Sequence, residues 1–176
     1  EHSANITEAA QFNDASTGLF FMRVRFEVQT PPPAPLREAF TALASRYSMR
    51  WDLHNANARM PTVIMVSKLG HCLNDLLFRY RSQLLPLDIR AIVSNHRDFY
   101  QLAASYDIPF HHIPVTAETK ERAEDRLRDV LAHENVELVV LARYMQVLSE
   151  RLCNDLSGRA INIHHSFLPG FKGAKA

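Results

Sequence analysis

Residues 62–67 read Thr-Val-Ile-Met-Val-Ser, an uninterrupted apolar run that ends on a polar residue. A short run of this kind, rich in β-branched side chains, is typical of a strand that is buried on both faces. Similar runs follow at residues 89–95, 110–115, 137–143 and 160–166, and amphipathic helical patterns separate them. Strands that alternate with helices predict an α/β fold with a doubly wound, mostly parallel sheet.

The sequence before these runs has a different pattern. Residues 4–12 and 19–28 predict two strands joined by a turn-rich connector. After a proline cluster, apolar side chains at helical spacing predict a helix over residues 36–47, and a closing strand is predicted at residues 49–55. The order strand, strand, helix, strand indicates a small α+β domain that lacks its opening strand and helix.

The change of pattern predicts two domains. We expect the α+β domain to span residues 1–57, a linker to span residues 58–61 and the α/β domain to span residues 62–176. The chain begins with Glu1 and stops at Ala176, directly after its most polar segment. We therefore expect the sequence to be incomplete at both ends.

The composition favours a small molecule as the partner. With 20 Lys and Arg against 19 Asp and Glu, the formal net charge is +1, which makes a nucleic-acid or membrane-surface partner a poor hypothesis. The two cysteines, Cys72 and Cys153, are far apart, and no apolar run approaches the roughly 18 residues of a membrane span. We expect a cytoplasmic protein.

The turn after the first α/β strand argues against a nucleotide cofactor. Residues 67–72 read Ser-Lys-Leu-Gly-His-Cys, with one glycine where a dinucleotide or P-loop motif has several. A phosphate cradle needs converging backbone N–H groups without Cβ atoms. Two interpretations of Lys68 and His71 are equally good: they belong to a functional site, or Lys68 simply lies in a solvated loop and His71 at a helix start.

The last predicted strand carries the sharpest chemical signal. Asn162 and His164 lie two residues apart, so their side chains project to the same face of the strand. An amide N–H can stabilise the oxyanion of an acyl-transfer intermediate, and an imidazole can handle the proton. The alternative is a structural role, in which both side chains hydrogen-bond to nearby backbone. Catalysis by this pair would also need a third group.

The paired histidines do not predict a metal site. His164 and His165 project to opposite faces of a strand, as do His111 and His112, so neither pair can chelate one ion. Residues 143–148 follow another strand, and their Met, amide and aliphatic side chains can line a pocket for a flat heterocycle or pack in the core.

The residues also resemble a known family. Residues 62–176 resemble the formyltransferase-fold domain of formyltetrahydrofolate deformylases, and residues 1–57 are similar to the ferredoxin-like ACT domain that precedes it there. The resemblance rests on four segments: IVSNHRDF (92–99), IPFHHIPVT (108–116), LARYMQVLSERL (141–152) and GRAINIHHSFLPGFKGA (158–174).

The resemblance implies hydrolysis of 10-formyltetrahydrofolate to tetrahydrofolate and formate, which supplies formate for purine synthesis and balances one-carbon folate pools. It implies that Asn162 and His164 are catalytic, together with an Asp expected beyond Ala176. It implies no metal and no covalently bound cofactor. The folate contacts that it implies are Met145, Gln146, Val147 and Leu148.

Two other functions remain open at this point. Phosphoribosylglycinamide formyltransferases resemble the chain but carry a glycine-rich phosphate loop where residues 68–72 stand here, which favours water over an amine as the acceptor. A non-catalytic sensor of folate or an amino acid is the other alternative. The ACT resemblance implies a homo-oligomer and an amino-acid effector, whose site has its nearest remnant at Asn5 and Ile6.

Overall fold

The computed structural model describes residues 4–28 and 34–163. The chain divides into two compact units, residues 1–58 and 59–176, and each is described by itself. Within the described ranges, no helix is both long and apolar enough to cross a bilayer.

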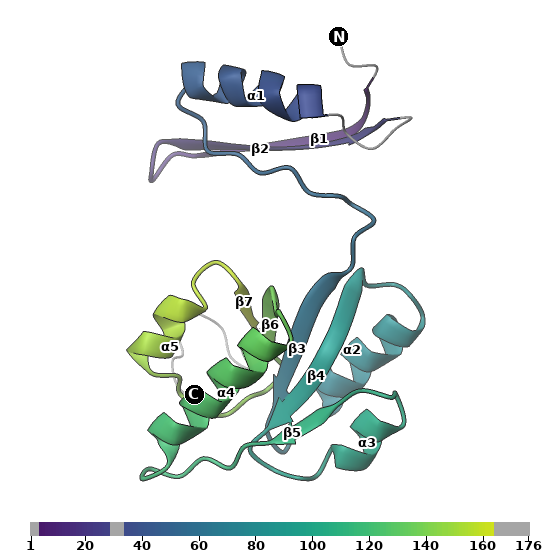
Figure 1. Ribbon diagram of the computed structural model, residues 1–176, viewed down its shortest axis with the longest axis vertical. Helices are drawn as coiled ribbons and strands as arrows, with labels where there is room; N and C mark the ends of the chain where they lie inside the picture. The colour runs from purple at the N-terminus through teal and green to yellow at the C-terminus, as the bar shows by residue number, and fades with distance from the viewer. Residues whose placement is uncertain (1–3, 29–33, 164–176) are drawn as a thin grey trace. The chain divides into compact units, whose positions relative to one another are not determined.

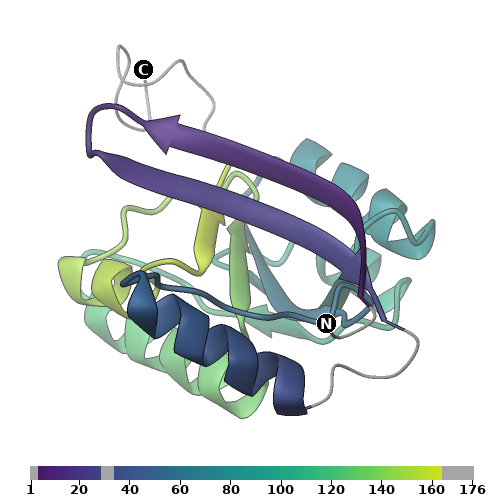
Figure 2. The same cartoon turned by 90° about the horizontal axis from the view of Figure 1, so that it is seen from above.

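The first unit contains a hairpin and a helix. Strands β1 (Asn5–Asp14) and β2 (Leu19–Glu27) pair antiparallel along their length, as the sequence predicts, and they lie side by side in Figure 2. Gly18 closes the turn between them with φ +67, a conformation that costs glycine little. Helix α1 (Ala34–Arg46) follows.

The predicted closing strand at residues 49–55 is wrong, because these residues form no strand and pair with none among residues 4–28 and 34–163. Side-chain contacts hold the segment against α1 instead. The rings of Trp51 and Phe40 meet edge to face with centroids 4.8 Å apart, and Arg37 Nη2 donates to the Leu53 carbonyl at 3.2 Å. These contacts leave a sheet of two strands in the described part of this unit.

The second unit is built on a parallel sheet of five strands, which confirms the prediction of an α/β fold. The strand order is β5-β4-β3-β6-β7. In chain order the strands are β3 (Met60–Val66), β4 (Leu87–Ser94), β5 (Phe110–His112), β6 (Leu138–Leu141) and β7 (Ala160–Asn162).

Helices cover both faces of this sheet (Figure 1). On one face, Leu73 and Leu77 pack against β3 and β4; on the other, Leu127 and Leu131 pack against β3 and β6. The alternation of the strand side chains between two separate apolar cores makes the sheet doubly wound. The helices are α2 (His71–Arg81), α3 (Tyr100–Ala104), α4 (Lys120–His133) and α5 (Glu150–Asp155).

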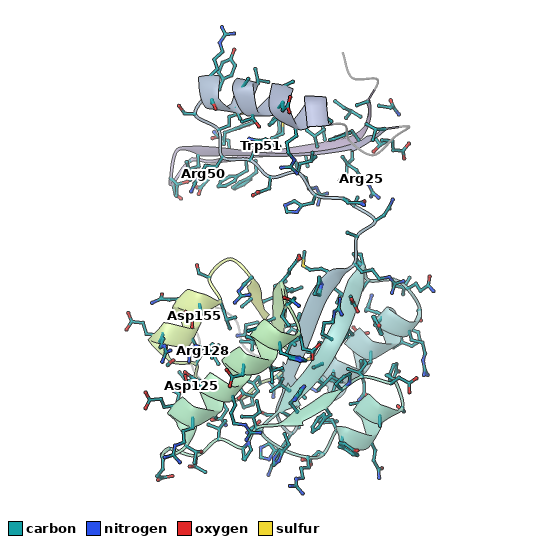
Figure 3. All side chains as sticks on the ribbon, viewed as in Figure 1. Arg25, Arg50, Trp51, Asp125, Arg128 and Asp155 are labelled. Carbon is teal, nitrogen blue, oxygen red and sulfur yellow. The ribbon has the colours of Figure 1, made fainter. Side chains whose placement is uncertain are left out.

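One arginine joins the two helices on the β6 side of the sheet. Arg128 of α4 donates from Nε to Asp155 of α5 at 2.7 Å and from Nη1 to Asp125 at 2.9 Å, and Figure 3 labels the three side chains. Their hydrogen bonds raise the pKa of Arg128. Of these two pairs, the one between Arg128 and Asp155 connects α4 to the end of α5.

Met145, Leu148 and Leu152 are spaced as on one face of a helix, but only Leu152 lies in one. Residues 143–148 form a loop, and α5 starts only after Ser149, whose Oγ accepts the N–H of Leu152 at 3.2 Å. Two features explain why the helix starts here. Arg143 has φ +63, which is incompatible with a right-handed α-helix, and serine is a preferred N-cap residue.

Candidate functional site

The strand order places a ligand-binding edge between β3 and β6. The chain leaves β3 to β4 on one side, and later returns to β6 on the other side. In open α/β sheets ligands bind at such a reversal, beyond the carboxyl ends of the strands. The residues at this edge follow the strands β3, β4 and β6, and β7 is the neighbour of β6 in the sheet.

Ser67 connects three of these strand ends. Its hydroxyl donates to Asn95 Oδ1 at 2.7 Å and accepts the N–H of Met145 at 2.9 Å. Its own N–H donates to the Arg143 carbonyl at 3.2 Å. Asn95 Nδ2 lies 3.1 Å from His96 Nε2. Ser67 and Asn95 are buried, so each hydrogen bond satisfies a group that would be costly to leave unpaired.

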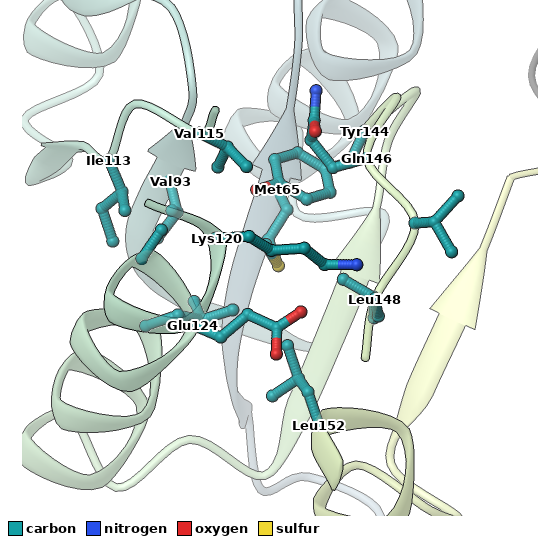
Figure 4. A pocket seen from close by; sticks show the side chains of 13 residues that line it. Met65, Val93, Ile113, Val115, Lys120, Glu124, Tyr144, Gln146, Leu148 and Leu152 are labelled. Carbon is teal, nitrogen blue, oxygen red and sulfur yellow. The ribbon is translucent and has the colours of Figure 1, made fainter. Parts of the chain in front are cut away.

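The loop 143–148 lies against a small hollow between the sheet and α4 (Figure 4). Gln146, Val147 and Leu148, three of the four residues expected to contact a heterocycle, line it, and Met145 does not. The hollow has about 10 Å³ of free volume, room for no more than about one water molecule. A ligand ring therefore does not fit in it as it stands.

Charged and polar groups occupy the other wall of the hollow. Lys120 and Glu124 reach into it from α4 (Figure 4). Both carboxylate oxygens of Glu124 accept hydrogen bonds from Ser149, one from its N–H at 2.8 Å and one from its hydroxyl. Burial, and secondly the charge of Glu124, raise the pKa of Tyr144 to about 12, so this phenol is neutral at physiological pH.

Asn162 lies at the carboxyl end of β7, on the strand next to β6. It pairs with Leu141 in the ladder, and the following Ile163 N–H donates to the Leu141 carbonyl at 3.1 Å. Paired strands are about 5 Å apart, so Asn162 and the start of the loop 143–148 share one edge of the sheet. Asn162 is exposed there. His164 and His165 lie outside the described residues.

The turn at residues 67–72 packs against the ring of Phe99. Gly70 precedes α2, and a Cβ atom added to it would collide with the ring of Phe99. The ring thus fills the space that the missing side chain leaves. Lys68 is exposed, and His71 begins α2, as one of the two sequence interpretations expects.

Histidines do not assemble a metal site in the part of the chain that the structure describes. No group of three or more His, Cys, Asp and Glu side chains is close enough to hold an ion within residues 4–28 and 34–163. His112 Nδ1 instead accepts a hydrogen bond from Arg97 Nε at 3.3 Å. His111 Nε2 is buried without a hydrogen-bond partner among the described residues.

Sequence reasoning missed the residues that hold the loop, namely Ser67, Asn95, Glu124 and Ser149. Ser67 and Asn95 each follow a buried strand directly, a position that marks polar residues at the ligand edge. Glu124 carries no such signal, because it sits among charged residues on a surface helix. Its role depends on a partner 25 residues away.

A doubly wound parallel sheet with this strand order is a Rossmann-like α/β fold, a class in which ligands bind beyond the carboxyl ends of adjacent strands. The Formyl transferase family model matches residues 60–176. The chain therefore belongs to the formyl transferase family, and its second unit is a formyltransferase-fold domain.

The similarity to known proteins extends over both units. A formyltetrahydrofolate deformylase of Corynebacterium sp. is 47% identical over 99% of this chain, and the match spans 62% of that relative. The crystal structure of formyltetrahydrofolate deformylase from Burkholderia mallei is 49% identical, with a TM-score of 0.89 over 98% of this chain and 62% of that one. The chain thus spans about 62% of the length of these relatives.

The phosphoribosylglycinamide formyltransferase of Coxiella burnetii is less similar. Its structure is 32% identical, with a TM-score of 0.58 over 65% of this chain and 56% of that one.

Proposed function

We propose that the protein hydrolyses 10-formyltetrahydrofolate to tetrahydrofolate and formate. The observation that carries this proposal is the similarity, over nearly the whole chain, to relatives and structures named formyltetrahydrofolate deformylase. In a cell this reaction supplies formate for purine synthesis and balances the one-carbon folate pools. We expect the protein to act in the cytoplasm, without a metal or a covalently bound cofactor.

The proposed chemistry is acyl transfer to water. Water attacks the formyl carbon, and the formyl oxygen becomes an oxyanion. The bond between the formyl carbon and N10 then breaks. N10 takes a proton, and the formic acid that is released loses one. We assign the Asn162 amide N–H as the donor to the oxyanion and His164 as the group that handles the proton. An Asp beyond Ala176 would position the water. The exposed place of Asn162 at the ligand edge supports its assignment.

We assign the folate contacts to the loop at Met145, Gln146, Val147 and Leu148. The loop follows β6 at the reversal of strand order, where ligands of such sheets bind. The single glycine in the turn at residues 67–72 supports water as the acceptor, because a phosphate cradle needs several converging backbone N–H groups without Cβ atoms.

We propose that residues 1–57 are a regulatory ACT-like domain joined through residues 58–61 to the catalytic domain at 62–176. This domain would bind an amino-acid effector and pair with a second copy of the chain. The antiparallel hairpin followed by α1 is consistent with such a domain, and the apolar side chains exposed on β2 support pairing.

The test is formate release by the natural full-length protein supplied with 10-formyltetrahydrofolate and no amine. We expect formate and tetrahydrofolate in equal amounts. Asn162→Ala should lower kcat by about 10²–10³-fold, equivalent to about 3 kcal/mol of barrier, because an oxyanion donor is lost. Asn154→Ala on the exposed face of α5 is the control and should be unchanged.

Two results would favour the other functions. Formate that is transferred only when glycinamide ribonucleotide is added would identify a transferase. Tight folate binding without turnover under either condition would identify a sensor. Near-normal turnover of Asn162→Ala would remove the oxyanion role from this residue.

A further inference from the structure

The loop 143–148 is held at both ends by side chains from outside it. At its start, the N–H of Met145 donates to Ser67 Oγ at 2.9 Å. At its end, the N–H of Ser149 donates to Glu124 Oε1 at 2.8 Å, and the Ser149 hydroxyl donates to Oε2. The two acceptors come from the end of β3 and from α4, which are parts of the rigid core.

Each acceptor is itself fixed in position. Ser67 has 3% of its surface exposed, and its proton is committed to Asn95 Oδ1 at 2.7 Å, so its lone pair faces the Met145 N–H. Glu124 lies on the same helix as Leu127 and Ala123, which are buried in the core. The Ser149 hydroxyl also caps α5 by accepting the Leu152 N–H.

Between these two points the loop presents free backbone groups. The N–H groups of Gln146, Val147 and Leu148 donate to no other group within the described residues. Val147 is 77% exposed. The side of the loop that faces the hollow is packed, since the hollow holds about 10 Å³, so a ligand ring reaches these groups from the solvent side.

We propose that Ser67 and Glu124 are positioning residues that clamp the two ends of the loop and thereby preorganise its backbone for the pterin ring. The identity of the ligand, the pterin ring, rests on the proposed function. A loop that is ordered before binding loses less conformational entropy when the ligand arrives. The clamp therefore acts on substrate affinity, and the chemical step at Asn162 is independent of it.

The test uses Ser67→Ala and Glu124→Ala in the natural full-length protein. Each should raise the KM for 10-formyltetrahydrofolate by about tenfold and change kcat less than about twofold, because the lost order must be restored on binding. Ser67→Thr keeps the hydroxyl acceptor and Glu124→Gln keeps one acceptor oxygen, that of the amide, so both should recover most of the affinity. Ser105→Ala and Glu121→Ala, at residues whose side chains make no hydrogen bond to the loop among the described residues, are the matched controls.

Amide hydrogen exchange without ligand separates the clamp from the reaction. We expect the Met145 N–H to exchange faster in Ser67→Ala and the Ser149 N–H to exchange faster in Glu124→Ala, while the midpoints of global unfolding show that both variants fold. Folded variants with unchanged KM, or with a fall in kcat alone, would overturn the proposal. If the wild type releases no formate, the proposed function fails, and the exchange of these two amides still decides whether the clamp exists.

Discussion

At the scale of single residues, Tyr144 makes the pH dependence of stability testable. Its pKa rises from 10.0 in the free side chain to about 12 in the folded protein. The folded state thus holds this proton more tightly than the unfolded state. The stabilisation is complete below pH 10 and is lost as the pH rises from 10 to 12.

Tyr144→Phe should remove this dependence. Relative to the variant, the wild type should lose about 1 kcal/mol of unfolding free energy between pH 10 and pH 11, and about the same again up to pH 12. Urea unfolding of both proteins at pH 9, 10 and 11 measures the difference. The exposed Tyr100→Phe is the control, and equal slopes for wild type and Tyr144→Phe would contradict the prediction.

At the scale of elements, the start of α2 can approach the residues before α3 because Gly70 has no side chain. Gly70 has φ −95, so its backbone suits any residue, but the Phe99 ring occupies the place of a Cβ atom. Gly70→Ala should cost about 1–3 kcal/mol of unfolding free energy because the ring must move.

A double-mutant cycle identifies the cause of that cost. Adding Phe99→Leu to Gly70→Ala should recover part of the stability, since the smaller side chain makes room. Gly158→Ala is the comparison: with φ +76 and nothing within 4 Å of the added Cβ atom, its cost of about 1–2 kcal/mol comes from the backbone, and Phe99→Leu should not relieve it. Strictly additive effects at Gly70 and Phe99 would exclude the steric explanation.

At the scale of the whole molecule, the hairpin predicts self-association. Phe20 and Met22 lie two residues apart on one face of β2 and are 60% and 61% exposed, and exposed apolar side chains that share a face favour association. Met22→Lys should shift the natural protein toward smaller species in sedimentation velocity, because it places a charge in the interface. The equally exposed Phe78→Lys on α2 should not. A monomeric wild type would refute the prediction.

Much of the second unit follows from local patterns. The apolar run at residues 62–67 predicts β3 because β-branched side chains without polar alternation suit a strand that is covered on both faces. Ala123, Leu127 and Leu131 recur at helical spacing and are buried as that spacing implies. The order of strands and helices along the chain therefore determines the α/β class.

Local patterns fail where distant residues decide the conformation. The spacing of Met145 and Leu148 is helical, yet both lie in the loop, because Arg143 adopts a left-handed conformation and Met145 is bound to Ser67, 78 residues earlier. The predicted strand at 49–55 fails because Trp51 packs on α1 instead of pairing.

The sequence by itself thus determined the α/β class, the faces of the helices and the family resemblance, since each depends on residues that are near one another in the chain or on long matching segments. Only the tertiary structure decided the strand order that places Asn162 beside the loop 143–148, and the clamp of that loop by Ser67 and Glu124. The physical reason is that a hydrogen bond between residues 25 or 78 positions apart leaves no periodic trace in the sequence.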